Sequence, residues 1–257
     1  MKTCHPKAML LALFLLSGSY SWSQTAAPAT APATSKALPK LPPPPTLPAN
    51  ATAAQKEEYQ RQTADYERRR WNYVLTDSAA RVRVLNEAPN TLLVESVKNH
   101  PVGTALDVGM GEGRNALYLA QLGWQVTGVD IADEALAYAQ KKARAMKVKI
   151  TTVQQDADRF DWGTNKWDLI VLSYAGGREY APKVMQALKP GGLVVLEGFH
   201  KDATQTMKIG DGVVYSTNEL KTLYSAAGLK IVRYEEPLGT ADFGKREVRL
   251  VKLVARK

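Results

Sequence analysis

Cysteine and histidine are scarce in this 257-residue sequence. Its one cysteine, Cys4, lies at the start of the chain, and there are three histidines. A lone cysteine cannot form an intramolecular disulfide, and no group of His, Cys and carboxylates has the spacing of a metal site. We therefore expect no metal, and no thiol chemistry once the first residues have been removed.

Two other features are missing. No apolar run is long enough to cross a bilayer, and no basic tract is interleaved with aromatics as in a nucleic-acid groove. The net charge of +9, from 34 Lys and Arg against 25 Asp and Glu, is spread along the chain. It indicates a basic, soluble surface. We expect no nucleic-acid partner, no stable membrane span, and a monomer or a dimer.

Residues 1–23 have the composition of a signal peptide. Lys2 and Lys7 precede the apolar stretch Ala8–Leu16, and small polar residues lead to a cut before Gln24. Cys4 precedes that stretch, so it is not placed as the lipid-accepting cysteine of a lipoprotein. We expect export to the periplasm or the medium, with the cytoplasm as second choice.

Two segments precede the main domain. Residues 24–50 contain eight of the fourteen prolines and predict an extended, partly polyproline-II linker. Residues 51–88 contain no glycine and are helical in pattern from about Ala53, with aromatic side chains that must pack on something. We expect an N-terminal helical cap over the domain at 89–257, in which Trp71 and Tyr73 are candidate lid residues; core packing is the alternative.

Strands and helices alternate from Pro101 onward. We expect strands at Thr104–Val108, Gln125–Asp130, Ile150–Gln154, Trp167–Ser173 and Leu193–Gly198, and helices at Arg114–Leu122, Asp133–Met146, before Leu188 and after Ser216. The last two strands, "LKIVRYEEP" and "EVRLVKLVARK", have no helix between them, which favours an antiparallel hairpin. The fold class is α/β: a doubly wound, Rossmann-like, mostly parallel sheet with an antiparallel C-terminal hairpin and helices on both faces.

A loop with three glycines, "DVGMGEGRN", follows the first strand directly. Gly109, Gly111 and Gly113 allow positive φ and a close approach of a ligand to the backbone. The G-x-G-x-G spacing differs from the dinucleotide fingerprint, because Arg114 occupies the place of the third glycine there. No triphosphate-binding loop is present in the sequence.

Carboxylates stand on both sides of this loop. Asp107 precedes it, where a carboxylate repels phosphate and suits an ammonium group. Asp130, nineteen residues after Gly111, ends the second strand and is placed to accept both hydroxyls of a ribose. A ribose at one end and a cationic amino acid at the other describe S-adenosylmethionine.

Five blocks of sequence in order resemble class I S-adenosylmethionine-dependent methyltransferases: "LDVGMGEGRN", the acid of "VTGVDIA", the acid of "VQQDADRF", "WDLIVLS" and "LKPGG". The stretch "GEGRNALYLAQLGWQVTGVD" is most similar to the small-molecule branch that includes tellurite-resistance-type enzymes. The resemblance implies S-adenosyl-L-methionine as cofactor and a small-molecule methyl acceptor. It implies as cofactor-binding residues Asp107, Gly109, Gly111, Gly113, Asp130, Ile131, Asp156, Ala157 and Ser173. Met110 stands where cysteine is common, and its side chain is expected to face away from the ligand.

A catalytic base is not identified securely by the sequence. Tyr174 and His200 follow the fourth and fifth strands and are the candidates. The alternatives are that Tyr174 forms part of the pocket wall and that His200 is a loop histidine without a catalytic role. Arg178 could hold an anionic substrate or be solvated. An exported, non-catalytic protein that binds S-adenosylmethionine or a nucleoside is the second hypothesis for function. A nicotinamide-dependent oxidoreductase is disfavoured by the loop spacing, by Asp107 and by the terminal hairpin.

Overall fold

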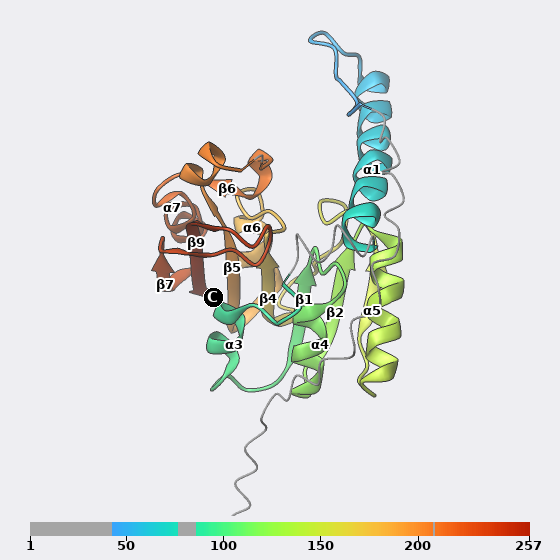
Figure 1. Ribbon diagram of the computed structural model, residues 1–257. Helices are drawn as coiled ribbons and strands as arrows, with labels where there is room; N and C mark the ends of the chain where they lie inside the picture. Colours follow the sequence, from blue (N-terminus) through green and yellow to red (C-terminus); the bar gives the residue numbers. More distant parts are fainter. Residues whose placement is uncertain (1–42, 77–85, 208) are drawn as a thin grey trace, which may run out of the picture. The chain divides into compact units, whose positions relative to one another are not determined.

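The computed structural model describes residues 43–76, 86–207 and 209–257. Helices and strands alternate along most of this range, and helices lie on both sides of a twisted sheet (Figure 1). The α-helices are α1 (Ala53–Thr76), α3 (Thr91–Val97), α4 (Arg114–Gln121), α5 (Asp133–Ala145), α6 (Ala181–Ala187) and α7 (Glu219–Ala226). The strands are β1 (Thr104–Val108), β2 (Gln125–Asp130), β3 (Thr151–Gln154), β4 (Trp167–Ser173), β5 (Leu188–His200), β6 (Val214–Tyr215), β7 (Lys230–Glu235), β8 (Leu238–Thr240) and β9 (Glu247–Arg256).

The main path of the sheet has the order β3-β2-β1-β4-β5-β9-β7. Strands β1 to β5 pair in parallel, whereas β9 runs antiparallel to both of its neighbours, β5 and β7. The predicted fold class is therefore confirmed, including the antiparallel C-terminal strand. The parallel register brings the carboxyl ends of β1 to β4 to one edge of the sheet, where a doubly wound fold places its ligand.

Side chains alternate between the two faces of the sheet and fill a separate core on each. On one face, Leu106 of β1 and Ile170 of β4 pack with α6 and α7. On the other, Ala105 and Leu169 pack with α3, α4 and α5. Because both faces are covered, β4 reads as the unbroken apolar run "WDLIVLS" in the sequence.

Several element boundaries differ from the expected ones. Strand β5 begins at Leu188 instead of Leu193, because Leu188 pairs with Trp167 across an irregularity in the β4–β5 ladder. It also continues to His200, which pairs with β6. Helix α3 and the short strands β6 and β8 were not predicted.

Helix α1 begins at Ala53, as the sequence predicts, and packs against α5. Leu75 of α1 is buried with Ala132 and Ala135 at the start of α5, and Trp71 packs on this cluster. The predicted signal peptide and most of the predicted linker lie outside the described residues, as do residues 77–85 of the expected cap. Within the described ranges, no helix combines the length and the apolar character needed to cross a membrane.

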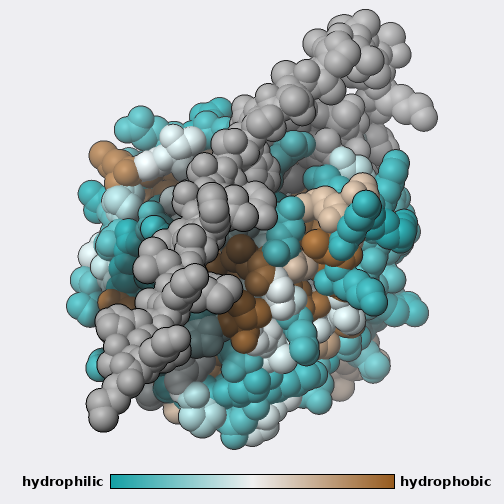
Figure 2. All heavy atoms as spheres, turned by 90° about the horizontal axis from the view of Figure 1, so that it is seen from below, coloured by the Kyte–Doolittle hydropathy of each residue, from teal (hydrophilic) through white to brown (hydrophobic). Residues whose placement is uncertain are grey.

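The surface is mixed in character. Figure 2 shows one face of the molecule, on which hydrophilic residues predominate and hydrophobic residues gather near the middle. Six large hydrophobic side chains are exposed among the described residues: Leu47, Val102, Leu122, Met146, Val232 and Leu238.

Replacing Gly128 of β2 with alanine is expected to destabilise the sheet. A Cβ at this position would overlap the thioether sulfur of Met110, a buried core residue. Overpacking of this kind typically costs about 1–3 kcal/mol, which urea unfolding would measure. On a Met110→Ala background the same substitution should cost much less, because the two side chains no longer compete for one space.

Gly210→Ala is the matched control, since an added Cβ there has no heavy atom within 4 Å. Equal losses in unfolding free energy for the Gly128 and Gly210 variants would contradict the expected packing.

Candidate functional site

A cavity of about 790 Å³ opens at the carboxyl edge of the parallel strands. Its wall includes the end of β1, the glycine loop, the ends of β2 and β4, and one side of α1. Of the residues predicted to bind a cofactor, seven line it: Gly109, Gly111, Asp130, Ile131, Asp156, Ala157 and Ser173. Residues far apart in the sequence therefore meet at one edge of the sheet, as the parallel arrangement requires.

The glycine loop takes a conformation that side chains rarely adopt. Gly109, Gly111 and Gly113 have φ values of 65°, 53° and 79°. Gly113 is the N-cap of α4, so the helix opens directly from the loop. Gly113 does not line the cavity; its positive φ turns the chain into the helix. The Met110 side chain packs in the core against Gly128, and Met110 is also among the residues that line the cavity.

Asp130 links the end of β2 to this loop. One carboxylate oxygen accepts a hydrogen bond from the Gly111 N–H at 2.7 Å, and the other accepts from the Ala132 N–H at 2.8 Å. Burial raises the pKa of this carboxyl, and the backbone hydrogen bonds oppose the rise. Each oxygen keeps a second lone pair, so the group can still accept from a ligand in the cavity.

Asp107 lies beneath the loop and is fully buried. Burial raises its pKa to about 7, against the lowering effects of the Arg114 charge and a backbone hydrogen bond from Ala116. Its Oδ2 atom has no hydrogen-bond partner among the described residues. A buried, unpaired carboxylate oxygen costs free energy unless a donor or a proton reaches it. Asp107 is thus suited to a cationic donor.

The remaining predicted cofactor residues occupy the neighbouring strand ends. Asp156 follows β3 and accepts from the Asp158 N–H at 2.9 Å, which fixes the turn that carries Ala157. Ser173 ends β4, and its hydroxyl accepts a hydrogen bond from Arg114 at 3.1 Å. Asp156, Ala157 and Ser173 all line the same cavity.

The two candidate bases are placed very differently. Tyr174 lines the cavity with φ of 57°, and its hydroxyl donates to the buried Glu197 at 2.6 Å. Burial, and then the adjacent Glu197 charge, raise its pKa strongly, so the phenol holds its proton. His200 does not line the cavity; its ring is buried, with Nε2 3.0 Å from Thr217 Oγ1 and Nδ1 accepting from the Asp202 N–H. Neither group is available as a base in this arrangement.

Sequence reasoning missed a polar hub at Asp242, in the loop between β8 and β9. Its carboxylate accepts from the side chains of Asn86 at 2.9 Å and Asn90 at 2.7 Å, and it pairs with Arg114 at 2.9 Å. Its backbone N–H donates to the Tyr174 hydroxyl at 3.2 Å. The only available signal was the Arg114 of the glycine loop, and nothing in the sequence points from there to a partner 128 residues away.

Aromatic side chains from separate elements meet above this hub. Phe243 packs edge-on against Trp71 of α1, with ring centroids 5.9 Å apart, and lies 6.5 Å from Tyr174. All three rings line the cavity. The other lid candidate, Tyr73, does not line it. Arg178 also lies away from the cavity wall and instead bonds to Glu219 and to the Val214 carbonyl.

The cavity wall is acidic although the chain as a whole is basic. Among the described residues, eight carboxylate side chains line it: Glu67, Glu87, Glu112, Asp130, Asp156, Asp158, Glu179 and Asp242. Within the same described ranges, three cationic side chains line it: Arg114, Lys142 and Arg159. Two of these are paired within the described structure, Arg114 with Asp242 and Lys142 with Glu112. Such a wall favours a cationic ligand over an anionic one.

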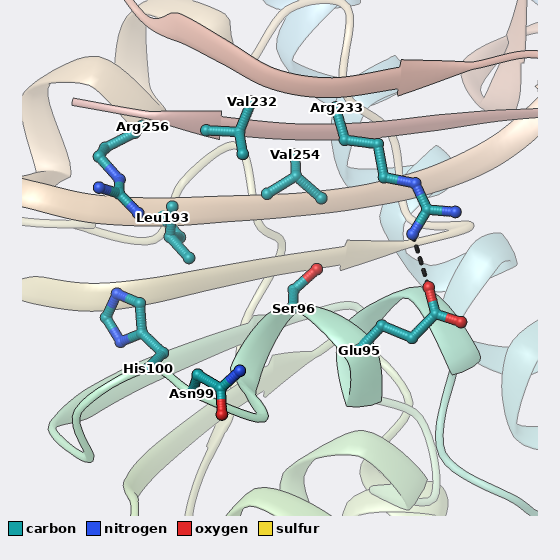
Figure 3. A pocket seen from close by; sticks show the side chains of 9 residues that line it. All are labelled: Glu95, Ser96, Asn99, His100, Leu193, Val232, Arg233, Val254 and Arg256. Atoms are coloured by element: carbon teal, nitrogen blue, oxygen red, sulfur yellow. Dashed lines mark hydrogen bonds and ion pairs between the residues drawn. The ribbon is translucent and has the colours of Figure 1, made fainter.

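A second, shallower hollow of about 320 Å³ lies between α3 and the strands β5, β9 and β7 (Figure 3). Leu193, Val232 and Val254 contribute apolar side chains to it, and an ion pair between Arg233 and Glu95 lies at one end. His100 lines this hollow and stacks on Trp124, at the opposite edge of the sheet from the main cavity. None of the predicted site residues belongs to it.

Comparison with protein families gives a match over the strands and the loop that build the main cavity. Residues 105–192 match the family described as "Methyltransferase domain". An uncharacterized methyltransferase of Synechocystis sp. is 31% identical over 140 residues, which are 51% of this chain and 64% of that protein. TehB of Haemophilus influenzae, a probable S-adenosyl-L-methionine-dependent methyltransferase, is 26% identical over 164 residues, which are 59% of this chain and 56% of TehB. The chain thus spans less than two thirds of the length of these curated relatives.

Solved structures show the same fold at lower identity. The crystal structure of TehB from Haemophilus influenzae superposes with a TM-score of 0.55 at 21% identity, covering 72% of this chain and 66% of that one. The [4+2]-cyclase SpnF superposes with a TM-score of 0.52 at 21% identity, covering 65% and 78%.

The residues present fit S-adenosylmethionine, the cofactor that this domain family uses. The unpaired Asp107 oxygen, the bare backbone at Gly109 and Gly111 and the acidic wall suit a sulfonium amino acid joined to a nucleoside. Asp130 would hold the ribose, and Ile131 with Asp156 and Ala157 the adenine, while Asp107, which is buried beneath the loop and does not line the cavity, would support the loop at the amino-acid end. When bound, the cofactor supplies an activated methyl group on a positively charged sulfur.

The buried Asp107 is expected to make stability depend on pH. Between about pH 4 and 7 the unfolded chain gives up this proton while the folded chain retains it, so the free energy of unfolding falls as pH rises. A shift of about three pKa units corresponds to a loss of up to about 4 kcal/mol. Asp107→Asn should lack this component, so its stability relative to the wild type should rise over the same pH range, as urea unfolding would show.

Asp161→Asn, at an exposed carboxylate outside the cavity wall, is the control and should follow the wild-type curve. Parallel pH profiles for the wild type and Asp107→Asn would rule out the raised pKa.

Proposed function

We propose, from the premise that residues 105–192 form a class I S-adenosylmethionine-dependent methyltransferase domain, that this protein transfers a methyl group to a small-molecule acceptor. The observation that carries the proposal is the cavity in which the glycine loop and Asp130 meet at one sheet edge, with Asp107 buried beneath the loop. Its acidic wall suits the sulfonium cofactor, and its volume of about 790 Å³ lies in the range of small-ligand pockets.

Methyl transfer is an in-line displacement at carbon, so the protein contributes mainly alignment and exclusion of water. Asp130 and the loop amides fix the nucleoside end, and Asp107 supports the loop from beneath at the amino-acid end. Trp71 and Phe243 cover the cavity from α1 and from the β8–β9 loop. The chain's own residues thus position two reactants and shield them, which is most of what this chemistry requires.

The second hypothesis is an exported, non-catalytic protein that binds S-adenosylmethionine or a nucleoside in the same cavity. The fold alone does not decide between the two, since a [4+2]-cyclase shares it. The intact set of cofactor residues supports binding of S-adenosylmethionine under both hypotheses, and methyl transfer to an acceptor is the property that separates them.

We further propose that the protein is exported, on the basis of residues 1–23. Export raises a supply problem, since S-adenosylmethionine is made in the cytoplasm. The cofactor then has to reach the exported protein, or the protein has to act before export.

Calorimetry with S-adenosylmethionine and S-adenosylhomocysteine tests the cofactor site. We expect both to bind, and Asp130→Ala to weaken binding by about tenfold to a hundredfold, the value of losing hydrogen bonds to a charged group. Asp161→Asn serves as the matched control and should bind normally; thermal unfolding of each variant would separate lost affinity from lost folding.

Absence of binding by either compound would reject the methyltransferase proposal. Binding without transfer of a labelled methyl group to any acceptor in a broad panel would favour the non-catalytic hypothesis.

N-terminal sequencing of the protein from its native host would test export. The expected first residue of the mature chain is Gln24, because the small residues before it suit a signal peptidase. An intact Met1 in the folded, accumulated protein would contradict this.

A further inference from the structure

We propose that the acceptor is a neutral amine or thioether carried on a flat apolar body, which becomes a cation when methylated, and that Trp71, Tyr174 and Phe243 hold it. The inference rests on the proposed methyltransferase function and adds the chemical class of the substrate.

The three rings form one aromatic surface beside the reacting end of the cavity. Tyr174 directly follows Ser173 at the end of β4, Phe243 lies 6.5 Å from it, and Trp71 lies 5.9 Å from Phe243. Tyr174 is held in place because its hydroxyl donates to Glu197 and its ring packs on Phe199 at 4.9 Å. Rings that converge from three elements can stack on a flat body, and their faces attract a cation within about 6 Å.

The charges around this surface select against anions. Arg114, the cation nearest to Ser173, is engaged by Asp242, by the Ser173 hydroxyl and by the Ala88 carbonyl. Lys142 is paired with Glu112, and Arg159, the third cation of the described wall, is exposed. An oxyanion or carboxylate would have to compete with Asp242 for Arg114. A cation would meet a carboxylate-rich wall and the rings of Tyr174 and Phe243, while the Arg70 guanidinium already lies over the Trp71 ring, 4.9 Å from its centroid.

The balance of charge and electrons in the methyl-transfer step agrees with a neutral acceptor. The lone pair of nitrogen or sulfur forms the new bond to the methyl carbon as the carbon–sulfur bond of the cofactor breaks, and that electron pair stays on the cofactor sulfur. The positive charge therefore moves from the cofactor to the acceptor atom. A tertiary amine or a thioether has no proton to release, so the step needs no base. It is therefore compatible with a Tyr174 that holds its proton and with a His200 that does not line the cavity.

The proposed preference for an acceptor that becomes a cation can be tested without turnover, by measuring ligand binding to the protein saturated with S-adenosylhomocysteine. The probes are meta-trimethylammoniophenol, which mimics a methylated product, its neutral isostere meta-tert-butylphenol, and an anionic meta-hydroxybenzenesulfonate. We expect calorimetry to show the cation binding about tenfold more tightly than the neutral isostere, as cation–π attraction in a desolvated site allows, and the sulfonate binding most weakly. Phe243→Ala should remove most of this preference and Phe243→Tyr should retain it.

Val232→Ala, an exposed change in the second hollow, is the control and should leave the preference unchanged. Equal affinity for the cation and its isostere, or tighter binding of the sulfonate, would overturn the proposal. Failure of S-adenosylhomocysteine itself to bind would instead reject the methyltransferase function, so the two failures are distinct.

A second arm separates nitrogen from sulfur acceptors. Dimethylaniline and thioanisole are each incubated with the protein and S-adenosylmethionine, and mass spectrometry detects the quaternary ammonium or sulfonium product. Methylation of either supports the inference and names the acceptor atom, while methylation of selenite or benzoate in preference to both contradicts it.

Discussion

The carboxylate of Asp130 is the interaction on which the site depends. It accepts hydrogen bonds from Gly111 and Ala132 and so holds the glycine loop against the end of β2. The parallel pairing of β1 with β2 brings the two together, with Asp107 opposite Gly128 in the register. If this contact were lost, the loop amides, the start of α4 and the carboxylate itself would no longer face one cavity.

The features that the sequence predicted correctly are local or periodic. The alternation of apolar strands and helices depends on neighbours in the chain, and the three glycines follow β1 directly, so the parallel sheet and the position of the loop could be inferred. Residues at strand ends could be placed in one site, because parallel strands deliver their carboxyl ends to the same edge.

The hub at Asp242 and the wall at Phe243 could not be predicted in the same way. Both lie in a short loop between β8 and β9. The side-chain partners of Asp242 are Asn86, Asn90 and Arg114, more than a hundred residues earlier, and Phe243 packs against Trp71 and Tyr174. A loop residue has no periodic signal, and its role arises only when β9 inserts beside β5. For the same reason His200 seemed to be a candidate base: its place after a predicted strand was correct in outline, but strand β5 runs further and buries the ring.

The position of β9 inside the sheet has a consequence for biosynthesis. Its residues, 247–256, lie between β5 and β7, so the order of synthesis and the order in space disagree. A growing chain can assemble β1 to β5 early, but β7 has no partner until β9 has emerged from the ribosome, and the Asp242 hub cannot form until then. Between the synthesis of β5 and that of β9 the nascent protein therefore exposes an unpaired strand edge at β5, an edge open to association with other chains.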